Sequence, residues 1–358
     1  MYLENISLIN FKNYDELNLK FSSQVNCFVG ENGSGKTNLL DAIHYLSMTK
    51  SAFHAVEQQT IRHEAPFFMV QGQFIKEKKH HIFCSFQSGQ KKVFKHNKKP
   101  YEKISEHIGD YPLVLIAPDD TDVIREGSEL RRRFFDSILS QIDKDYLHTL
   151  MRYNHILKQR NSLMKQFSMQ NYFDKDLLEP YNIQLLEHAR AIFNKRKSFI
   201  FRFSPLVKKH YANISDGKEA VELLYQSELD MERYEAFFIQ NIKKDLMMQR
   251  TTSGVHKDDF EFMIDNYSLK KTGSQGQQKS FLIALKLAHF DVMKDDKGFK
   301  PLLLLDDIFD KLDDKRIGKL LDMIANNVFG QLFVTDARPE RTSRIFEHLP
   351  AEVKVFNF

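Results

Sequence analysis

A glycine-rich segment near the amino terminus carries the clearest chemical pattern in this 358-residue chain. The segment consists of Gly30, Glu31, Asn32, Gly33, Ser34, Gly35, Lys36 and Thr37, and it matches G-x-x-x-x-G-K-[ST] in full. Its glycines allow backbone N–H groups to turn toward a phosphate, and a helix that begins there adds a positive dipole. Lys36 is expected to reach the β- and γ-phosphates, and the Thr37 hydroxyl to ligate Mg²⁺. A chance glycine-rich turn is the alternative, but a strand pattern before the segment and a helix pattern after it favour nucleotide binding.

Two adjacent carboxylates follow an apolar run later in the chain. Leu302–Leu305 predicts a buried strand, and Asp306 and Asp307 come directly after it. Because α/β sheets bind ligands at the carboxyl ends of their strands, Asp306 is expected to hold magnesium through its water shell. Asp307 would orient or activate the attacking water. A polar helix cap after an ordinary strand is the alternative, and the complete phosphate loop weakens it.

A third group comprises Ser274, Gln275, Gly276 and Gln277, at the predicted start of an apolar helix. A serine hydroxyl and a glycine backbone at a helix start form an anion site, although a simple N-cap explains the same residues. The order, with this group before the magnesium strand, is that of ABC-type ATPases. Two-fold pairing would let the group of one subunit cover the ATP bound by the other, so ATP is expected to promote a homodimer.

The elements that must position these groups fall into three parts. Strand patterns cover the first thirty residues and about residues 67–96, and Val25–Val29 leads directly into the phosphate loop. From Ser128 to about Lys209 the apolar spacing is helical, and the last 100 residues return to an α/β rhythm. We therefore expect an α/β protein: an ABC-type ATPase lobe with mixed and antiparallel sheets, formed by residues 1–120 and 250–358. Residues 121–249 would form a mainly helical inserted lobe without a long coiled coil.

Charge distribution suggests where a polyanion could bind. The chain has 52 basic and 48 acidic residues, but nine lysines and only two acids lie between Lys76 and Lys103. Within that stretch the DNA-binding candidates are Lys91, Lys92, Lys98 and Lys99. Arg190–Lys209 is a second candidate, with seven basic residues and no acid. Solvated surface is the alternative for both stretches.

Other classes of protein are disfavoured by composition. No apolar run is long enough for a membrane span, and the amino terminus lacks the pattern of a signal peptide. Two cysteines support neither a disulfide framework nor a zinc site. A cytoplasmic location without membrane contact is the expectation.

Taken together, these motifs resemble the RecF family of bacterial DNA replication and repair proteins. Three further stretches carry the resemblance: Met1–Tyr14, then Ala117–Asp120 with Gly127 and Arg131–Asp136, and Gly254–Asp259. The resemblance runs from residue 1 to about 313. It implies slow ATP hydrolysis with Mg²⁺, binding to gapped, single-stranded and double-stranded or junction DNA, and partners of the RecR and RecO type. Gap repair and the SOS response are the implied processes.

The sequence departs from related patterns at four places. Val255 replaces a usual proline, and Phe309–Asp313 differs from the family's residues before Leu-Asp. Asp336 stands where many ABC-type ATPases have a switch histidine, and its replacement is not evident from the sequence. Asp307 stands where most ABC enzymes have glutamate, a shorter reach that agrees with slow turnover.

Two other functions share the nucleotide motifs. An ABC transporter subunit would need a surface for membrane-subunit helices and would not need the helical insertion. A head fragment of a chromosome-structural or double-strand-break ATPase would carry a long heptad coil between its motifs, and none is visible. The lysine-rich and helical middle of the chain favours the DNA-binding ATPase.

Overall fold

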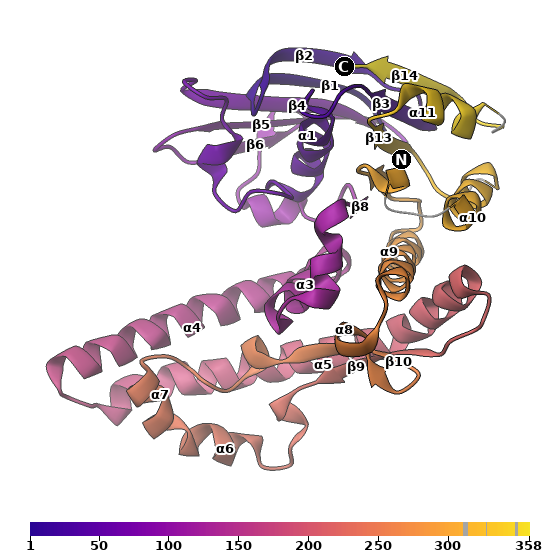
Figure 1. The fold of residues 1–358 in the computed structure, drawn as a ribbon. Coiled ribbons are helices and arrows are strands. Elements are labelled where there is room, and N and C mark those ends of the chain that lie inside the picture. The colour runs from indigo at the N-terminus through magenta and orange to yellow at the C-terminus, as the bar shows by residue number, and fades with distance from the viewer. Residues whose placement is uncertain (311–313, 327, 348–349) are drawn as a thin grey trace. The chain divides into compact units, whose positions relative to one another are not determined.

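The computed structural model describes residues 1–310, 314–326, 328–347 and 350–358. Lys311–Asp313, part of the departure noted at Phe309–Asp313, lie outside the described residues. The chain divides into two compact units, each treated by itself below (Figure 1). The first unit comprises Met1–Asp120 and Lys286–Phe358, and the second comprises Thr121–Leu285.

The second domain boundary differs from the expectation of residue 250. Residues 250–285 belong to the second unit, because β10 (Asp259–Ile264) pairs antiparallel with β9 (Val221–Gln226). Hydrogen-bonded strands belong to the same sheet, and β9, the partner of β10, lies inside the predicted insertion. The boundary at residues 285 and 286 therefore falls within helix α9 (Gln275–Lys297).

A five-stranded parallel sheet forms the centre of the first unit. Its order is β14-β3-β13-β12-β8, with β14 at Val353–Asn357, β3 at Val25–Val29, β13 at Leu332–Asp336, β12 at Leu302–Leu305 and β8 at Leu113–Ile116. Strands β3, β12 and β13 are apolar almost throughout and buried, as is typical of a parallel sheet covered on both faces. Because all five strands are parallel, their carboxyl ends lie along one edge.

An antiparallel sheet of six strands accompanies the parallel sheet in this unit. Its order is β2-β1-β4-β5-β6-β7, with β1 at Tyr2–Phe11, β2 at Tyr14–Lys20, β4 at Phe67–Ile75, β5 at Lys79–Gln87, β6 at Val93–His96 and β7 at Lys99–Pro100. Burial alternates along β4, as period-two patterning predicts. The side chain of Gln331, next to β13, hydrogen-bonds both backbone groups of Leu3 in β1 and thereby ties the sheets together.

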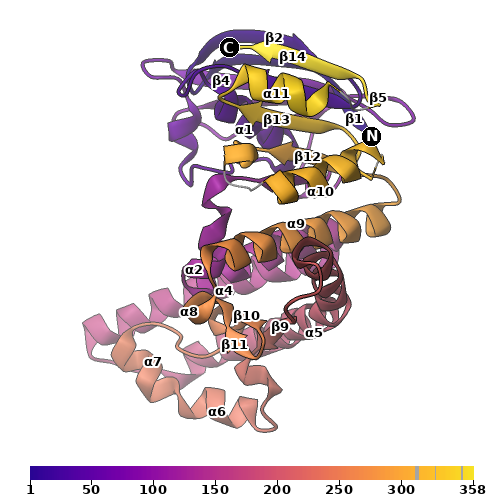
Figure 2. The same ribbon diagram turned by 45° about the vertical axis from the view of Figure 1, so that its right-hand side comes forward.

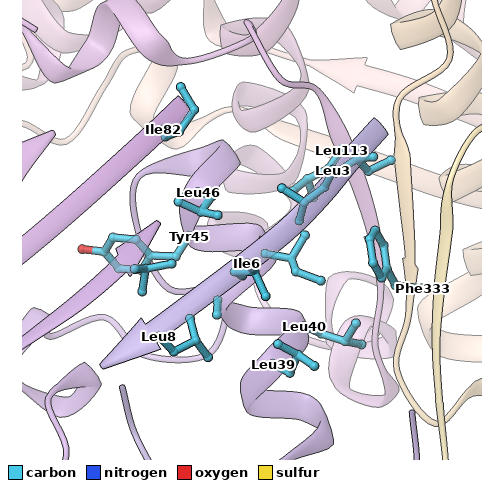
Figure 3. Packing of buried hydrophobic residues seen from close by; sticks show 14 of the residues in the cluster. Leu3, Ile6, Leu8, Leu39, Leu40, Tyr45, Leu46, Ile82, Leu113 and Phe333 are labelled. Carbon is cyan, nitrogen blue, oxygen red and sulfur yellow. The ribbon is translucent and has the colours of Figure 1, made fainter. Parts of the chain in front are cut away.

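Helix α1 (Lys36–Met48) contacts strands of both sheets and is buried on most of its surface. Its Leu39, Leu40 and Leu46 pack with Leu3, Leu113 and other apolar residues in one continuous core (Figure 3). The core holds the amino end of α1 in place, and the phosphate loop ends there. The remaining elements of the unit are η1 (Glu57–Thr60), η2 (Ile104–His107), η3 (Pro118–Thr121, which ends one residue into the second unit), η6 (Ile308–Asp310), α10 (Asp314–Ala325) and α11 (Pro339–Phe346).

The second unit is mainly helical and contains one small sheet. Its long helices α4 (Lys144–Gln170) and α5 (Lys175–Ser215) run antiparallel (Figure 2). The sheet has the order β11-β10-β9, with β11 at Tyr267–Ser268. The other elements are α2 (Asp122–Arg125), α3 (Ser128–Ile142), η4 (Glu228–Asp230), α6 (Tyr234–Gln240), α7 (Ile242–Met248), η5 (Val255–Lys257) and α8 (Leu269–Thr272).

Aromatic packing joins the helices of the second unit to its sheet. The ring of Phe135 on α3 lies 4.2 Å from that of Phe260 on β10 and 5.8 Å from that of Phe203 on α5, measured between centroids. The expected fold class, with mixed and antiparallel sheets and a mainly helical lobe without a long coiled coil, is confirmed. No helix within the described residues is long and apolar enough to cross a bilayer.

Candidate nucleotide-binding site

The predicted phosphate loop connects β3 to α1 as the motif requires. The Lys36 ammonium lies inside the loop and donates to the carbonyl oxygens of Gly30 and Glu31, both at 2.7 Å. Ser34 Oγ is 3.5 Å from the same nitrogen. The positive charge is therefore held at the amino end of α1, where the helix dipole also favours an anion.

The turn between β1 and β2 contacts this loop. Tyr14 donates its hydroxyl to the Gly35 carbonyl at 2.9 Å, and Asn13 Nδ2 lies 3.4 Å from the Ser34 carbonyl. Gly35 has φ 108°, and a Cβ there would lie 2.4 Å from Asn13 Nδ2. Only glycine fits this close, left-handed position. Asn13 and Tyr14 lie in the stretch that carries the family resemblance, but neither was among the predicted site residues.

Residues far apart in the sequence meet beside the loop. Thr37 Oγ1 lies 2.9 and 3.1 Å from the two carboxylate oxygens of Asp306, although the residues are 269 positions apart. Thr335 at the end of β13 donates to Asp306 Oδ1 at 2.7 Å. A hydroxyl and a carboxylate facing each other form the oxygen donor set that Mg²⁺ prefers, so the residues fit that ion. Thr335 was not among the predicted site residues, and only the strand order places it there.

The Asp306 carboxylate is buried, and this burial raises its pKa. Hydrogen bonds from Thr335 and Thr37, and the charge of Lys36, oppose the shift without cancelling it. An ionised carboxylate held away from water in this way is stabilised by a cation placed against it. The electrostatics therefore agree with a metal-holding role for Asp306.

Asp307 occupies an unusual backbone conformation at the end of β12. Its φ is 47°, in the left-handed region that aspartate and asparagine tolerate better than most residues. Its N–H donates to Thr335 Oγ1 at 2.9 Å, so Thr335 positions both acids. Thr335 thus contacts the side chain of Asp306 and the backbone of Asp307.

Asp336, which stands in the position of the absent switch histidine, is buried and bonded to residues of its own unit. It pairs with Val29 across the parallel ladder and is buried. Its carboxylate accepts from Arg341 Nε at 3.0 Å and from the Thr342 hydroxyl at 2.8 Å. Burial favours a higher pKa, but these donors, together with the Arg338 N–H, hold the pKa of Asp336 below its usual value. The carboxylate thus anchors the start of α11.

The predicted signature group begins helix α9 in the second unit. Ser274 N donates to Gln277 Oε1 at 2.7 Å, and Gln277 N donates to Ser274 Oγ at 3.2 Å. This reciprocal pair is a capping box. The Gln277 side chain also donates to Glu219 at 2.8 Å. In the single chain Ser274 therefore acts as an N-cap, and the N–H groups of Ser274 and Gln277 are each bonded to the side chain of the other residue.

The lysine candidates differ in their surroundings. Lys91 lies before β6, Lys98 in the turn after it and Lys99 at the start of β7. All three are exposed, and in the described parts of the chain their side chains form no hydrogen bond or ion pair. Lys92 is 15% exposed, ion-paired with Glu57 and bonded to the Thr49 carbonyl at 2.6 Å. Its charge is already neutralised inside the fold, so the grouping of Lys92 with the other three needs correction.

The second basic stretch, Arg190–Lys209, is largely neutralised by acids from elsewhere in the same unit. Its ion pairs are Arg190 with Glu235, Lys195 with Asp143, Arg196 with Asp136 and Asp258, Lys197 with Asp230, and Lys208 with Glu222. A stretch without acids in sequence is thus balanced in the tertiary structure. The observation favours Lys91, Lys98 and Lys99 as the polyanion contacts.

The loop, the two carboxylates and the parallel strands that carry them define a class: the P-loop α/β proteins of ABC type. Comparison with known proteins narrows the class. The model of the RecF/RecN/SMC N terminal domain family matches residues 2–354. The DNA replication and repair protein RecF of Flavobacterium johnsoniae is 48% identical over 358 residues, covering 100% of both chains.

Two solved structures agree with this comparison. The recombination mediator protein RecF-ATPrS in the RecFOR pathway has a TM-score of 0.90 at 28% identity, covering 100% of this chain and 96% of that one. The RecF-ATP structure from the same pathway has a TM-score of 0.87 at 30% identity, covering 94% and 92%. This chain therefore belongs to the RecF family of DNA replication and repair proteins, as the motifs predicted.

Proposed function

We propose that this chain is an ATP-dependent DNA-binding protein of recombinational repair and replication, which dimerises on ATP and hydrolyses it slowly. The observation that carries the proposal is the meeting of Thr37 and Asp306 at 2.9 Å beside the Lys36 loop. These are the groups that a nucleotide with its metal requires, and they are built on buried elements that hold them still. Similarity to RecF structures with ATP supports the same conclusion.

The chain's own residues divide the work at the site. Lys36 would exchange its carbonyl partners for β- and γ-phosphate oxygens, and the loop N–H groups would bind the same phosphates. Thr37 and Asp306 would hold Mg²⁺, which neutralises developing charge when bound. Asp307, placed by Thr335, would orient the attacking water. The slow rate agrees with the short reach of aspartate at this position.

The signature group would act on the ATP of a second subunit. Ser274 and Gln277 satisfy each other in the single chain, so a γ-phosphate would have to replace at least one bond of their capping box. Only ATP, not ADP, offers that phosphate, and this difference would shift the monomer–dimer equilibrium. Hydrolysis would then release the dimer.

Ser274→Arg should block dimerisation and turnover while leaving ATP binding by the monomer intact. A long cation at this helix start fills the space that a partner's phosphate would enter. Sedimentation with ATP and Mg²⁺ measures pairing, and titration with a fluorescent ATP analogue measures binding. Ser274→Thr, which keeps the capping hydroxyl, is the matched control and should still pair. A Ser274→Arg dimer, or a native chain that stays monomeric at micromolar concentration with ATP, would refute this role.

DNA would contact the exposed lysines at the two ends of β6. Lys91 lies before β6 and Lys98 in the turn after it, so the two cations flank a four-residue strand about 13 Å long, at about 3.3 Å per residue, and could contact different phosphates. Lys91→Glu, Lys98→Glu and Lys99→Glu combined should weaken DNA binding and lower the slope of log K against log salt by about 0.9 per lost contact. Fluorescence anisotropy at several salt concentrations measures both quantities.

The control reverses the same charge elsewhere. Lys158, Lys165 and Lys175 are exposed on α4 and α5 of the second unit, and their change to glutamate alters the net charge equally. The control should keep the native salt slope. Equal losses in both triple variants would mean that net charge, and not this patch, determines DNA affinity.

The remaining parts of the proposal rest on family membership. Partners of the RecR and RecO type, gapped and single-stranded or double-stranded DNA as substrates, and roles in gap repair and the SOS response follow from similarity to RecF of the RecFOR pathway. A cytoplasmic location stays a prediction.

A further inference from the structure

A cavity of about 380 Å³ lies in the second unit, between two motifs that the ATP site does not use. One motif is Arg131–Asp136 on α3, and the other is Gly254–Asp259 around η5. Residues from both line the cavity, including Arg132, Arg133 and Lys257. Its volume is at the small end of the range for ligand sites, about 300–1,000 Å³.

Ion pairs and hydrogen bonds fix the two motifs against each other. The Arg131 guanidinium binds both carboxylate oxygens of Asp259, at 2.7 and 2.9 Å. Arg132 Nη1 donates to the Asp258 carbonyl at 2.6 Å and to Ser128 Oγ at 2.7 Å. Both arginines thus hold the wall of the cavity in place.

The lining has more positive than negative groups. Four cations, Arg132, Arg133, Arg196 and Lys257, face two carboxylates, Glu129 and Asp136. Asp136 bonds Arg196 through both oxygens at 3.0 Å, and Glu129 pairs with Arg133 at 2.5 Å. Within the described residues, Arg132 and Lys257 have no carboxylate at ion-pair distance. Two cations are therefore left for an anion in the cavity.

Repulsion among the cations agrees with this balance. Burial and the charge of Arg196 lower the pKa of Arg132, and the carboxylates of Asp258, Asp136 and Asp259 oppose the shift without cancelling it. Burial also lowers the pKa of Lys257, with further contributions from Arg250 and Arg132. The charge of Arg132 disfavours the charged form of Lys257, and an anion bound between them would oppose this effect.

A neutral histidine completes the wall beside Lys257. His256 Nε2 lies 3.1 Å from the Thr251 carbonyl, which can only accept, so Nε2 carries the proton and Nδ1 accepts from the Tyr153 hydroxyl at 2.7 Å. Burial lowers the pKa of His256 to about 4. With both ring nitrogens engaged, the imidazole is fixed in orientation.

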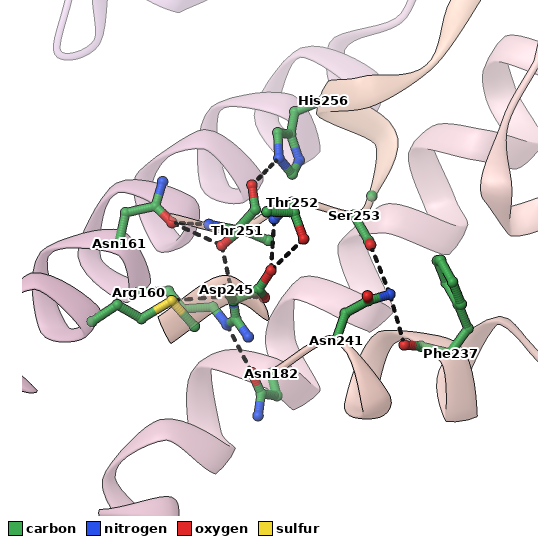
Figure 4. A network of polar contacts seen from close by, with 12 residues as sticks. Arg160, Asn161, Asn182, Phe237, Asn241, Asp245, Thr251, Thr252, Ser253 and His256 are labelled. Carbon is green, nitrogen blue, oxygen red and sulfur yellow. Dashed lines mark hydrogen bonds and ion pairs between the residues drawn. The ribbon is translucent and has the colours of Figure 1, made fainter. Parts of the chain in front are cut away.

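Behind His256, a buried polar network holds the loop that precedes it (Figure 4). Arg160 Nη1 donates to Asp245 at 2.8 Å and to Thr251 Oγ1 at 2.7 Å. Thr251 N donates to Asn161 at 2.7 Å. The loop is therefore held in place before any ligand arrives, which reduces the entropy lost on binding.

We propose that this cavity binds a phosphate group, as a nucleotide monoester or as a phosphodiester of DNA. A guanidinium with free N–H groups and a nearby ammonium are the side chains that recognise phosphate. The proposal is independent of the ATP site, because no residue of that site lines the cavity.

The test uses the full-length chain with Lys36→Ala, so that the phosphate loop does not compete. Pyrophosphate and a mononucleotide are titrated by calorimetry into this chain and into the same chain carrying Lys257→Gln. We expect saturable binding that Lys257→Gln weakens by about 10- to 100-fold, typical for one charged hydrogen bond. Lys243→Gln, an exposed lysine on α7 outside the cavity, is the control and should leave binding unchanged.

A second arm distinguishes the source of the phosphate. DNA binding is measured with a single-stranded oligonucleotide and chains that keep Lys36. If the cavity binds a DNA phosphate, Lys257→Gln should bind the oligonucleotide more weakly than the native chain and with a lower salt slope. If the cavity binds a free nucleotide instead, Lys257→Gln should leave the DNA affinity unchanged and should still weaken the phosphate binding measured by calorimetry. If Lys36→Ala does not fold, the same titrations on the native chain saturated with ADP replace it.

Two outcomes would overturn the proposal. One is the absence of saturable phosphate binding, or equal binding with and without Lys257→Gln. The other is binding of an acidic hexapeptide that depends on Lys257 while phosphate does not bind, which would assign the cavity to a carboxylate. Neither outcome bears on the ATP site, whose test is the loss of ATP binding in Lys36→Ala alone.

Discussion

We expect Lys36→Ala to lose ATP binding and turnover while the fold survives. Lys36 donates two hydrogen bonds within the loop, at 2.7 Å each, and it forms no ion pair with the residues that the structure describes. A charged hydrogen bond of this kind contributes typically 1.5–3 kcal/mol, or roughly 10- to 150-fold in affinity. Because the proposed role of Lys36 is to contact the β- and γ-phosphates, we expect the effect on turnover to exceed the effect on binding.

Calorimetric titration with ATP and Mg²⁺ measures the loss of binding, and phosphate release measures the loss of turnover. Circular dichroism and the melting temperature without nucleotide should stay near the native values. Lys78→Ala, an exposed lysine between β4 and β5, is the matched control and should bind ATP normally. Undiminished ATP affinity and hydrolysis in Lys36→Ala would refute the assignment of this loop.

Asp307→Asn should keep ATP binding but slow hydrolysis by about 10²–10⁴-fold, the usual effect of losing a general base. The proposed metal ligand is Asp306, whose carboxylate accepts from Thr37, and the substitution leaves that contact in place. The left-handed conformation of Asp307, with φ 47°, is one that asparagine also tolerates. The substitution therefore separates loss of chemistry from loss of folding.

An ATP-bound dimer should accumulate in Asp307→Asn, because pairing continues while release by hydrolysis stops. Sedimentation with ATP detects this species, and rapid-quench assays give the single-turnover rate. Thr335→Val is a second test of the same arrangement: it removes the hydroxyl that contacts both Asp306 and Asp307 and should also slow turnover. Hydrolysis by Asp307→Asn at the native rate would place the base elsewhere.

The class of fold and the strand–loop–helix geometry of Gly30–Thr37 could be predicted from the amino-acid sequence alone. This geometry depends on the local backbone and on the helix that follows, and both are encoded within a few residues. The leucines of β12 likewise predict a buried strand with its acids at the carboxyl end. Strands, helices and turns of this kind can be predicted because they depend mainly on nearby residues.

The tertiary structure decided which distant residues meet. Thr335 reaches Asp306 only because β13 lies beside β12 in the parallel sheet, and strand order is not a property of either strand alone. The second unit ends at residue 285 and not at the predicted 249, because β10 pairs with β9 and strand pairing could not be predicted from either strand alone.

The availability of charged side chains could not be predicted from the local sequence. Arg190–Lys209 contains no acid, yet its cations pair with acids such as Asp143 and Glu235 from other elements. Lys92 pairs with Glu57, whereas Lys91 beside it is exposed. An ion pair depends on distance in space and on burial, and a sequence window contains neither. Residue types and their local spacing therefore determined what chemistry this protein can perform, and packing determined which of its charges remain available.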